Sequence, residues 1–220
     1  MPSNRCSRCP HGNVHTVHFC AAKGQALATL KSGYHHGDLS TALIEAGLHL
    51  TRTGGPEALT IREATRRVGV SPNAAYRHFI DREALLSAVA SAIQHQMAAR
   101  MQGSARRHAS DRLRAVGMGY IKFALDEPGW FTVAFFGAVG PNDETASAPP
   151  YLALVDALDA MVDAGSLLPN RRVGAEWPCW SAVHGFAELA LRGPLRHASR
   201  RDIDALAGRT VDDIIAGVLR

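Results

Sequence analysis

The stretch TIREATRRVGVSPNAAYRHF, residues 60–79, decides the fold. Thr60 and Glu63 have the spacing of a capping box, in which the Thr hydroxyl accepts a hydrogen bond from one free amide of the first turn and the Glu carboxylate from another. Gly69 ends this helix about two turns later, because glycine readily adopts the left-handed conformation found at helix C-termini. Ser71 and Pro72 then open a second helix, with Pro at the first helical position, where no amide donor is needed. Two short helices joined by a tight turn predict a helix-turn-helix.

The two helices divide their residues between an inner and an outer face. Small or apolar residues, Ala64, Val68, Val70 and Ala75, are expected to hold the helices together. The helix after Ser71 is then the recognition helix, whose N-terminal residues reach base edges in the major groove. Polar and basic side chains here suit bases and phosphates, although such residues also form ordinary solvated surfaces. The predicted DNA contacts are Thr60, Arg62, Ser71, Asn73, Tyr76, Arg77, His78 and Arg82.

Helical periodicity continues on both sides of this motif. A helix is expected to start at Asp38 and to end at the Gly-Gly-Pro of residues 54–56, and Asp81 is expected to cap a long helix that ends near Gly103. Strand-like alternation is sustained nowhere. Further amphipathic segments fall at residues 111–126, 130–136, 151–164, 172–191 and 202–219. The sequence therefore predicts an all-α protein of about nine helices, with a tail over 1–33, a DNA-binding domain over 34–103 and a larger helical domain over 104–220.

Charge is unevenly distributed along the chain, whose net charge is +4. Residues 1–110 carry 13 Lys and Arg against 6 Asp and Glu, whereas residues 111–220 carry 11 against 14. A basic first half favours a polyanionic partner for that half. The first residues lack the apolar run of a signal peptide and no segment has the length of a membrane span, so we expect a cytoplasmic protein without a membrane partner.

Residues 34–86 resemble the DNA-binding domain of TetR-type transcriptional regulators. The resemblance rests on the Gly-Val-Ser-Pro turn at residues 69–72, the Tyr-x-His-Phe at residues 76–79 and the Arg-Glu-Ala-Leu-Leu that begins at Arg82, all in the family's order and spacing. It implies a homodimer that places its recognition helices in successive major grooves of a palindromic operator. It also implies phosphate contacts for Tyr76 and His78, a basic residue at position 82 where the family usually has Lys, and a core position for Phe79.

The second half resembles the family through the stretch Trp180-Ser-Ala-Val-His184-Gly185, which is similar to the Trp…His-Gly motif of one class of TetR C-terminal domains. Most aromatic residues of the chain also fall in this half, and such a set can line an apolar cavity in a helical bundle or simply fill its core. His184 is expected to be hydrogen-bonded within an apolar stretch. The predicted ligand contacts are Phe123, Trp130, Phe131, Phe135, Trp177, Trp180 and His184.

By the resemblance, the chain is expected to be a repressor that a small apolar or aromatic effector releases from its operator. By the resemblance, the last two long helices form the dimer interface; the apolar residues Ile203, Leu206, Val211, Ile214, Ile215 and Val218 give the second of them one packing face. An effector that favours a different spacing of the recognition helices would shift the protein away from its DNA-binding state, with the long helix after Asp81 as the lever. No cofactor is expected. A DNA-binding protein without small-molecule control is the main alternative.

The first twenty residues offer another alternative, a metal or redox response. Cys6, Cys9, His15 and His18 could supply four zinc ligands, with Cys20 nearby, but only five residues separate the two pairs, fewer than in zinc fingers. We therefore predict no metal site. An enzyme is not expected either, because the chain has no Gly-rich phosphate loop, nucleophile elbow or His-Glu-x-x-His motif.

Overall fold

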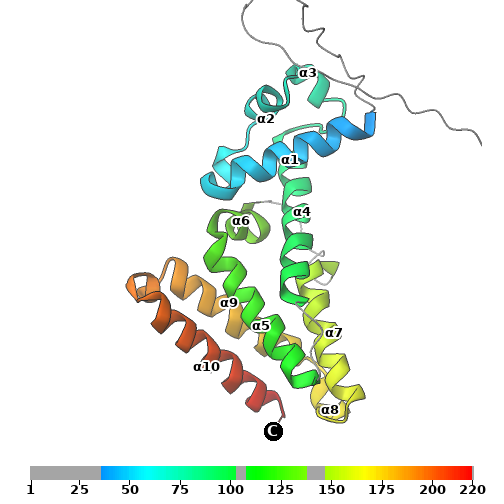
Figure 1. Ribbon diagram of the computed structural model, residues 1–220. Coiled ribbons are helices and arrows are strands. Elements are labelled where there is room, and N and C mark those ends of the chain that lie inside the picture. The colour runs from blue at the N-terminus through cyan, green and yellow to red at the C-terminus, as the bar shows by residue number, and fades with distance from the viewer. Residues whose placement is uncertain (1–35, 103–107, 138–146, 220) are drawn as a thin grey trace, which may run out of the picture. The chain divides into compact units, whose positions relative to one another are not determined.

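The computed structural model describes residues 36–102, 108–137 and 147–219, with side chains from residue 39 onward. These ranges contain ten α-helices and no strand, which confirms the all-α prediction (Figure 1). The α-helices are α1 (His36–Gly54), α2 (Ile61–Val68), α3 (Pro72–Ala75), α4 (Arg82–Gln102), α5 (Ala109–Asp126), α6 (Pro128–Thr132), α7 (Pro149–Asp163), α8 (Pro169–Arg172), α9 (Glu176–Leu191) and α10 (Arg200–Leu219). Two short 3-10 turns, η1 (Pro56–Ala58) and η4 (Pro194–His197), and a π-helical turn, η2 (Val133–Gly137), complete the described elements.

The first three helices gather at one end of α4 and share a core with it (Figure 1). Leu43 of α1, Ala64 of α2, Ala75 of α3 and Leu85 of α4 are completely buried there. Phe79, which follows α3, is also buried, as expected for a core residue. Apolar residues at helical spacing thus hold α2 and α3, which are too short to be stable alone, against α1 and α4.

The predicted helix ends are partly confirmed. Asp81 caps α4, since its carboxylate accepts a hydrogen bond from the Ala84 amide at 2.8 Å. Thr60 caps α2 through the Glu63 amide at 3.1 Å, but the Glu63 carboxylate binds Arg66, so only half of the capping box forms. Ser71 precedes α3 without a side-chain capping bond. The first helix starts at His36, two residues before the expected cap at residue 38.

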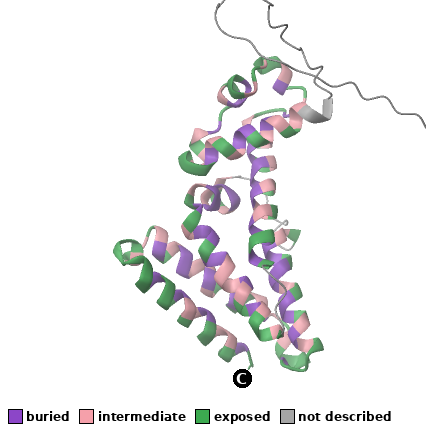
Figure 2. Cartoon of the chain, in the orientation of Figure 1, coloured by how far each residue is buried: buried purple, intermediate pink, exposed green. Residues whose placement is uncertain are grey.

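The second half is built around α5, which contacts α4, α7, α9 and α10. The segment expected to be helical over 172–191 is α9, which starts four residues later, at Glu176, because Gly174 has φ +76° and interrupts the helical path. The tenth helix is the short α8, which lies almost wholly before that segment and was not predicted. Buried residues line the inner sides of the helices, whereas the outer side of α10 is exposed (Figure 2). No helix in the described ranges could cross a membrane.

Candidate DNA-binding face and ligand groove

The helix-turn-helix is formed by α2, Gly69 and α3. Gly69 has φ +79°, the left-handed conformation that its place at the C-terminus of α2 requires, and its amide donates to Thr65 O at 2.9 Å. Beyond the turn, α3 packs on α2 through Ala64 and Ala75, while Val68 and Val70 are half-buried beside them. The predicted inner face is therefore the observed one, and the opposite side of α3 is left exposed.

Most predicted DNA contacts lie on that exposed side. The exposed residues are Thr60, Arg62, Ser71, Asn73, Tyr76 and Arg77, and Tyr76 is exposed over 54% of its surface although it is aromatic. His78 is half-buried. The predicted set omitted Arg66 and Arg67 of α2 and Ile80 after α3, which are also exposed, Ile80 at 83%. An aromatic ring and an aliphatic side chain left in solvent beside several cations are features of a surface that has a partner.

Arg82 lies differently from the other predicted contacts. Its Nε donates to Leu59 O at 2.7 Å and its Nη2 to Pro56 O at 2.6 Å, so the guanidinium is bound to the turn between α1 and α2. These two bonds join the start of α4 to the helix-turn-helix. The geometry thus gives Arg82 a positioning role and leaves few of its donors for a phosphate.

A groove of about 1070 Å³ runs between α4, η2, α7 and α9. On the α4 side its lining is polar and small, with Ser87, Ser91, Gln94 and His95 along one face of the helix. Asp156 of α7 is the one lining residue of the described chain with a carboxylate, and no Lys or Arg lines the groove there. Binding sites for drug-sized molecules have volumes of roughly 300–1,000 Å³, so the groove has room for an organic ligand.

Aromatic rings close the deep side of this groove around His184. Phe135, Phe136 and Trp180 line the groove with it, and their ring centroids lie 5.5, 5.8 and 6.4 Å from the imidazole. His184 Nδ1 is 2.7 Å from the hydroxyl oxygen of Tyr120, which confirms the expected hydrogen bond. Burial lowers the pKa of His184 and raises the pKa of Tyr120, so both groups are neutral near pH 7. We call the four lining residues Phe135, Phe136, Trp180 and His184 the His184 cage.

The other predicted ligand contacts lie outside the groove. Phe131 is fully buried behind the cage, edge-on to Tyr120 at 5.9 Å. Trp177 is 55% exposed, contacts Tyr151 and does not line the groove. Phe123 and Trp130 stack on each other at 6.4 Å in a different place, beneath α1. Of the seven residues, Phe135, Trp180 and His184 line the groove.

Phe123 and Trp130 belong to a contact region that we call the α1–α6 junction, together with Arg52, Arg100 and Glu127. Glu127 is only 4% exposed, and its carboxylate accepts two hydrogen bonds from Arg52, at 2.7 and 2.6 Å, and a third from Arg100 at 3.3 Å. Trp130 Nε1 donates to Leu48 O of α1 at 2.8 Å, and the Arg52 guanidinium lies over its ring at 5.2 Å. The bond to Arg52 lowers the pKa of Glu127. This junction fixes α1 to the helices around the groove.

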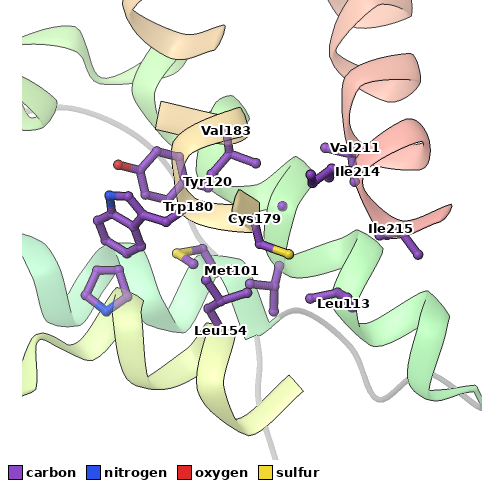
Figure 3. A pocket seen from close by; sticks show the side chains of 13 residues that line it. Met101, Leu113, Tyr120, Leu154, Cys179, Trp180, Val183, Val211, Ile214 and Ile215 are labelled. Carbon is purple, nitrogen blue, oxygen red and sulfur yellow. The ribbon is translucent and has the colours of Figure 1, made fainter. Parts of the chain in front are cut away.

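A second cavity, of only about 20 Å³, lies among α5, α7, α9 and α10 (Figure 3). Its lining is almost wholly apolar, with Leu113, Val183 and Val211 facing one another across it. The Cys179 thiol also faces it, and burial raises the pKa of this thiol to about 11, so it is protonated and unreactive near neutral pH. The space is that of a packing gap, too small for an effector.

Neither alternative based on the tail can be compared with the structure, because Cys6, Cys9, His15, His18 and Cys20 lie outside the described residues. Within the described ranges, no three His, Cys, Asp or Glu side chains are grouped so as to hold a metal ion.

Two family models match the chain. The model of bacterial regulatory proteins of the tetR family matches residues 43–89, which include the helix-turn-helix. A model of the tetracyclin repressor-like C-terminal domain matches residues 113–214, which include the His184 cage. A search among curated proteins found no match.

Solved structures show the same fold. A protein of unknown function from Rhodococcus sp. RHA1 aligns with a TM-score of 0.68 and 25% identity, over 86% of this chain and 100% of the other. A TetR variant from Acinetobacter baumannii AYE, solved with minocycline, aligns with a TM-score of 0.59 and 22% identity, over 84% and 96%. A TetR regulator from Streptomyces coelicolor aligns with a TM-score of 0.63 and 16% identity, over 81% and 96%.

Proposed function

The chain belongs to the TetR family of DNA-binding transcription regulators, and on that basis we propose that it is a homodimeric repressor released from its operator by a small molecule bound in the groove. The proposed DNA contacts are the exposed residues of the helix-turn-helix, Thr60, Arg62, Ser71, Asn73, Tyr76 and Arg77, with half-buried His78. The proposed effector contacts are Phe135, Trp180 and His184 of the cage. Arg82 acts by holding the motif in place.

The observation that carries this proposal is the position of α4. Its first residue, Arg82, is bound to the turn that precedes the helix-turn-helix, while Ser91, Gln94 and His95, further along the same helix, line the groove. A molecule that changes the position of α4 at the groove therefore also acts on the recognition helix. The α1–α6 junction provides a second connection, because Glu127 joins α1 to the helices behind the cage.

Dimerisation is proposed to use α9 and α10. Both helices expose apolar side chains, Leu189 and Leu206, on surfaces not covered by the rest of the chain. Within the chain, Ile203, Val211 and Val218 of α10 pack inward, and Arg114 of α5 holds the helix through Asp212 at 2.7 Å. Two copies joined in this way would present two recognition helices, and specific binding needs these about one DNA turn, roughly 34–36 Å, apart.

Release of the operator DNA follows from a shift between two arrangements of the dimer that differ in the spacing of its recognition helices. An effector that binds better to the arrangement with the wrong spacing lowers the population that can bind DNA. A coupling free energy of about 1–3 kcal/mol changes operator affinity roughly 5- to 150-fold. Neither a covalent reaction nor a cofactor is required.

The proposal is tested with DNA that flanks the chain's own gene, in salt near physiological strength and with excess competitor DNA. Fluorescence anisotropy is expected to show competitor-resistant binding that the double variant Tyr76→Ala/Arg77→Ala abolishes and that Arg209→Ala, a surface change on α10, preserves. A screen of small aromatic molecules is then expected to yield compounds that release the DNA. Binding that competitor removes, or release by the same compounds from a variant whose groove is blocked by Ser91→Trp at an exposed lining position, would overturn the proposal.

A further inference from the structure

The hydrogen bond between Tyr120 and His184 determines which imidazole nitrogen carries the proton. Tyr120 is 1% exposed, and its hydroxyl has no hydrogen-bond partner in the described chain other than His184 Nδ1, at 2.7 Å. A buried hydroxyl that donated to nothing would lose a hydrogen bond that water supplies in the unfolded chain. The hydroxyl therefore donates to Nδ1. A neutral imidazole that accepts at Nδ1 carries its proton at Nε2.

The Nε2–H group is then available for a ligand. His184 makes no other hydrogen bond within the described residues, and none of their buried side-chain nitrogen or oxygen atoms lacks a partner, so Nε2 is not fully buried. His184 lines the groove between the rings of Phe135, Phe136 and Trp180. The cage thus combines apolar walls with one directed donor, the combination that fixes the orientation of a small ligand.

We propose that the groove recognises a neutral aromatic molecule through a carbonyl-type acceptor that binds His184 Nε2–H, with Tyr120 as the positioning residue. This inference rests on the proposed function of the groove as the effector site. It narrows the effector from any apolar or aromatic compound to one with a hydrogen-bond acceptor on or beside its ring.

The charges around the cage favour a neutral ligand. No Lys or Arg of the described chain lines the groove, and Arg192, whose guanidinium lies 5.1 Å from the Phe136 ring centroid, is already paired with Glu188, so a carboxylate buried there would find no unpaired counter-ion among the described residues. A cation at the cage would face the Nε2–H donor, which has no lone pair to offer it. Asp156 lies across the groove on α7. A carbonyl oxygen accepts from Nε2–H at no such electrostatic cost.

The tautomer can be measured without a ligand. Nitrogen NMR of the histidine-labelled full chain, with the His184 signals assigned by their loss in His184→Phe, is expected to show Nε2 protonated and Nδ1 unprotonated near pH 7. A proton on Nδ1, or a doubly protonated ring at that pH, would overturn the inference.

Ligand class is tested by calorimetry with four probes that share one ring system: acetylnaphthalene, its isopropenyl analogue without an acceptor, naphthoate and naphthyltrimethylammonium. We expect acetylnaphthalene to bind best, about 3- to 10-fold more tightly than the isopropenyl analogue, as for one net hydrogen bond. His184→Phe is expected to bring this ratio near one, Tyr120→Phe to reduce it, and His49→Phe, a change on the exposed surface of α1 outside the groove, to preserve it.

The failures of the two proposals are distinguishable. If no probe binds the wild-type chain, the groove is not the effector site, and the proposed function fails together with this inference. If the probes bind but the ketone has no advantage, or keeps it in His184→Phe, only the inference about His184 fails. Tightest binding of naphthoate or of the ammonium probe would contradict the neutral class.

Discussion

Replacing Glu127 with Gln is expected to lower the free energy of unfolding by about 2 kcal/mol. The carboxylate is buried and accepts bonds from Arg52 at 2.7 and 2.6 Å, whereas a Gln amide keeps one acceptor and turns a donor toward a guanidinium. A hydrogen bond to a charged group contributes about 1.5–3 kcal/mol. We use the lower part of this range, because Arg52 and Arg100 are half-exposed and regain water when released. For a chain of this size the melting temperature would fall by about 4–8 °C.

Glu63→Gln is the matched control for this measurement. Glu63 binds Arg66 in the same two-bond geometry, but the pair is exposed and lies within α2, so its loss is expected to leave the melting temperature unchanged. Both variants would be compared with wild type by calorimetric thermal unfolding. Equal effects of the two substitutions, or no effect of Glu127→Gln, would refute the claim that the α1–α6 junction holds α1 in place.

Three more predictions concern the same elements. Because the pKa of Glu127 is lowered in the folded chain, its ion pairs stabilise the fold fully above the unfolded-state pKa of about 4.3 and lose this contribution as the pH falls through the lower folded-state pKa. The difference in melting temperature between wild type and Glu127→Gln is therefore expected to vanish on acidification. A difference that grew at low pH would refute the role assigned to Glu127. Gly129→Ala would place a Cβ 2.3 Å from Arg52 O, a contact that forces α6 away from α1; calorimetry is expected to show a lower melting temperature, and an unchanged one would contradict this packing. Arg77→Ala is expected to weaken operator binding and to reduce the slope of log affinity against log salt by about 1, as for one lost phosphate contact, whereas an unchanged slope in anisotropy titrations would exclude that contact.

The fold was predictable because its signals are local. Thr60, Gly69 and Asp81 act on residues within one turn, and the spacing of Ala64, Ala75 and Leu85 defines a buried face without reference to the rest of the chain. The start of α9 was expected four residues too early because Gly174 is compatible with both a helix and a break, and only its positive φ in the folded chain decides between them.

The ligand site was predictable only in part, because ring orientation depends on contacts between distant segments. Trp130 and Phe131 are neighbours in sequence, yet Trp130 binds the Leu48 carbonyl of α1 while Phe131 packs against Tyr120. The Arg52–Glu127 pair spans 75 residues and follows no sequence period. The polar residues of α4 that line the groove have the spacing of an ordinary solvated helix face, so nothing in the sequence distinguished them.

Sequence-specific operator binding by a pair of recognition helices is tested by selecting duplexes that the full chain binds from a randomised pool and by measuring how many chains each duplex holds. We expect an enriched inverted repeat, with half-sites about one helical turn or roughly 10 base pairs apart, that binds an even number of chains. Its enrichment is expected to disappear with Tyr76→Ala. Failure to enrich any sequence, or enrichment of a single unrepeated site bound by one chain, would contradict this mode of binding.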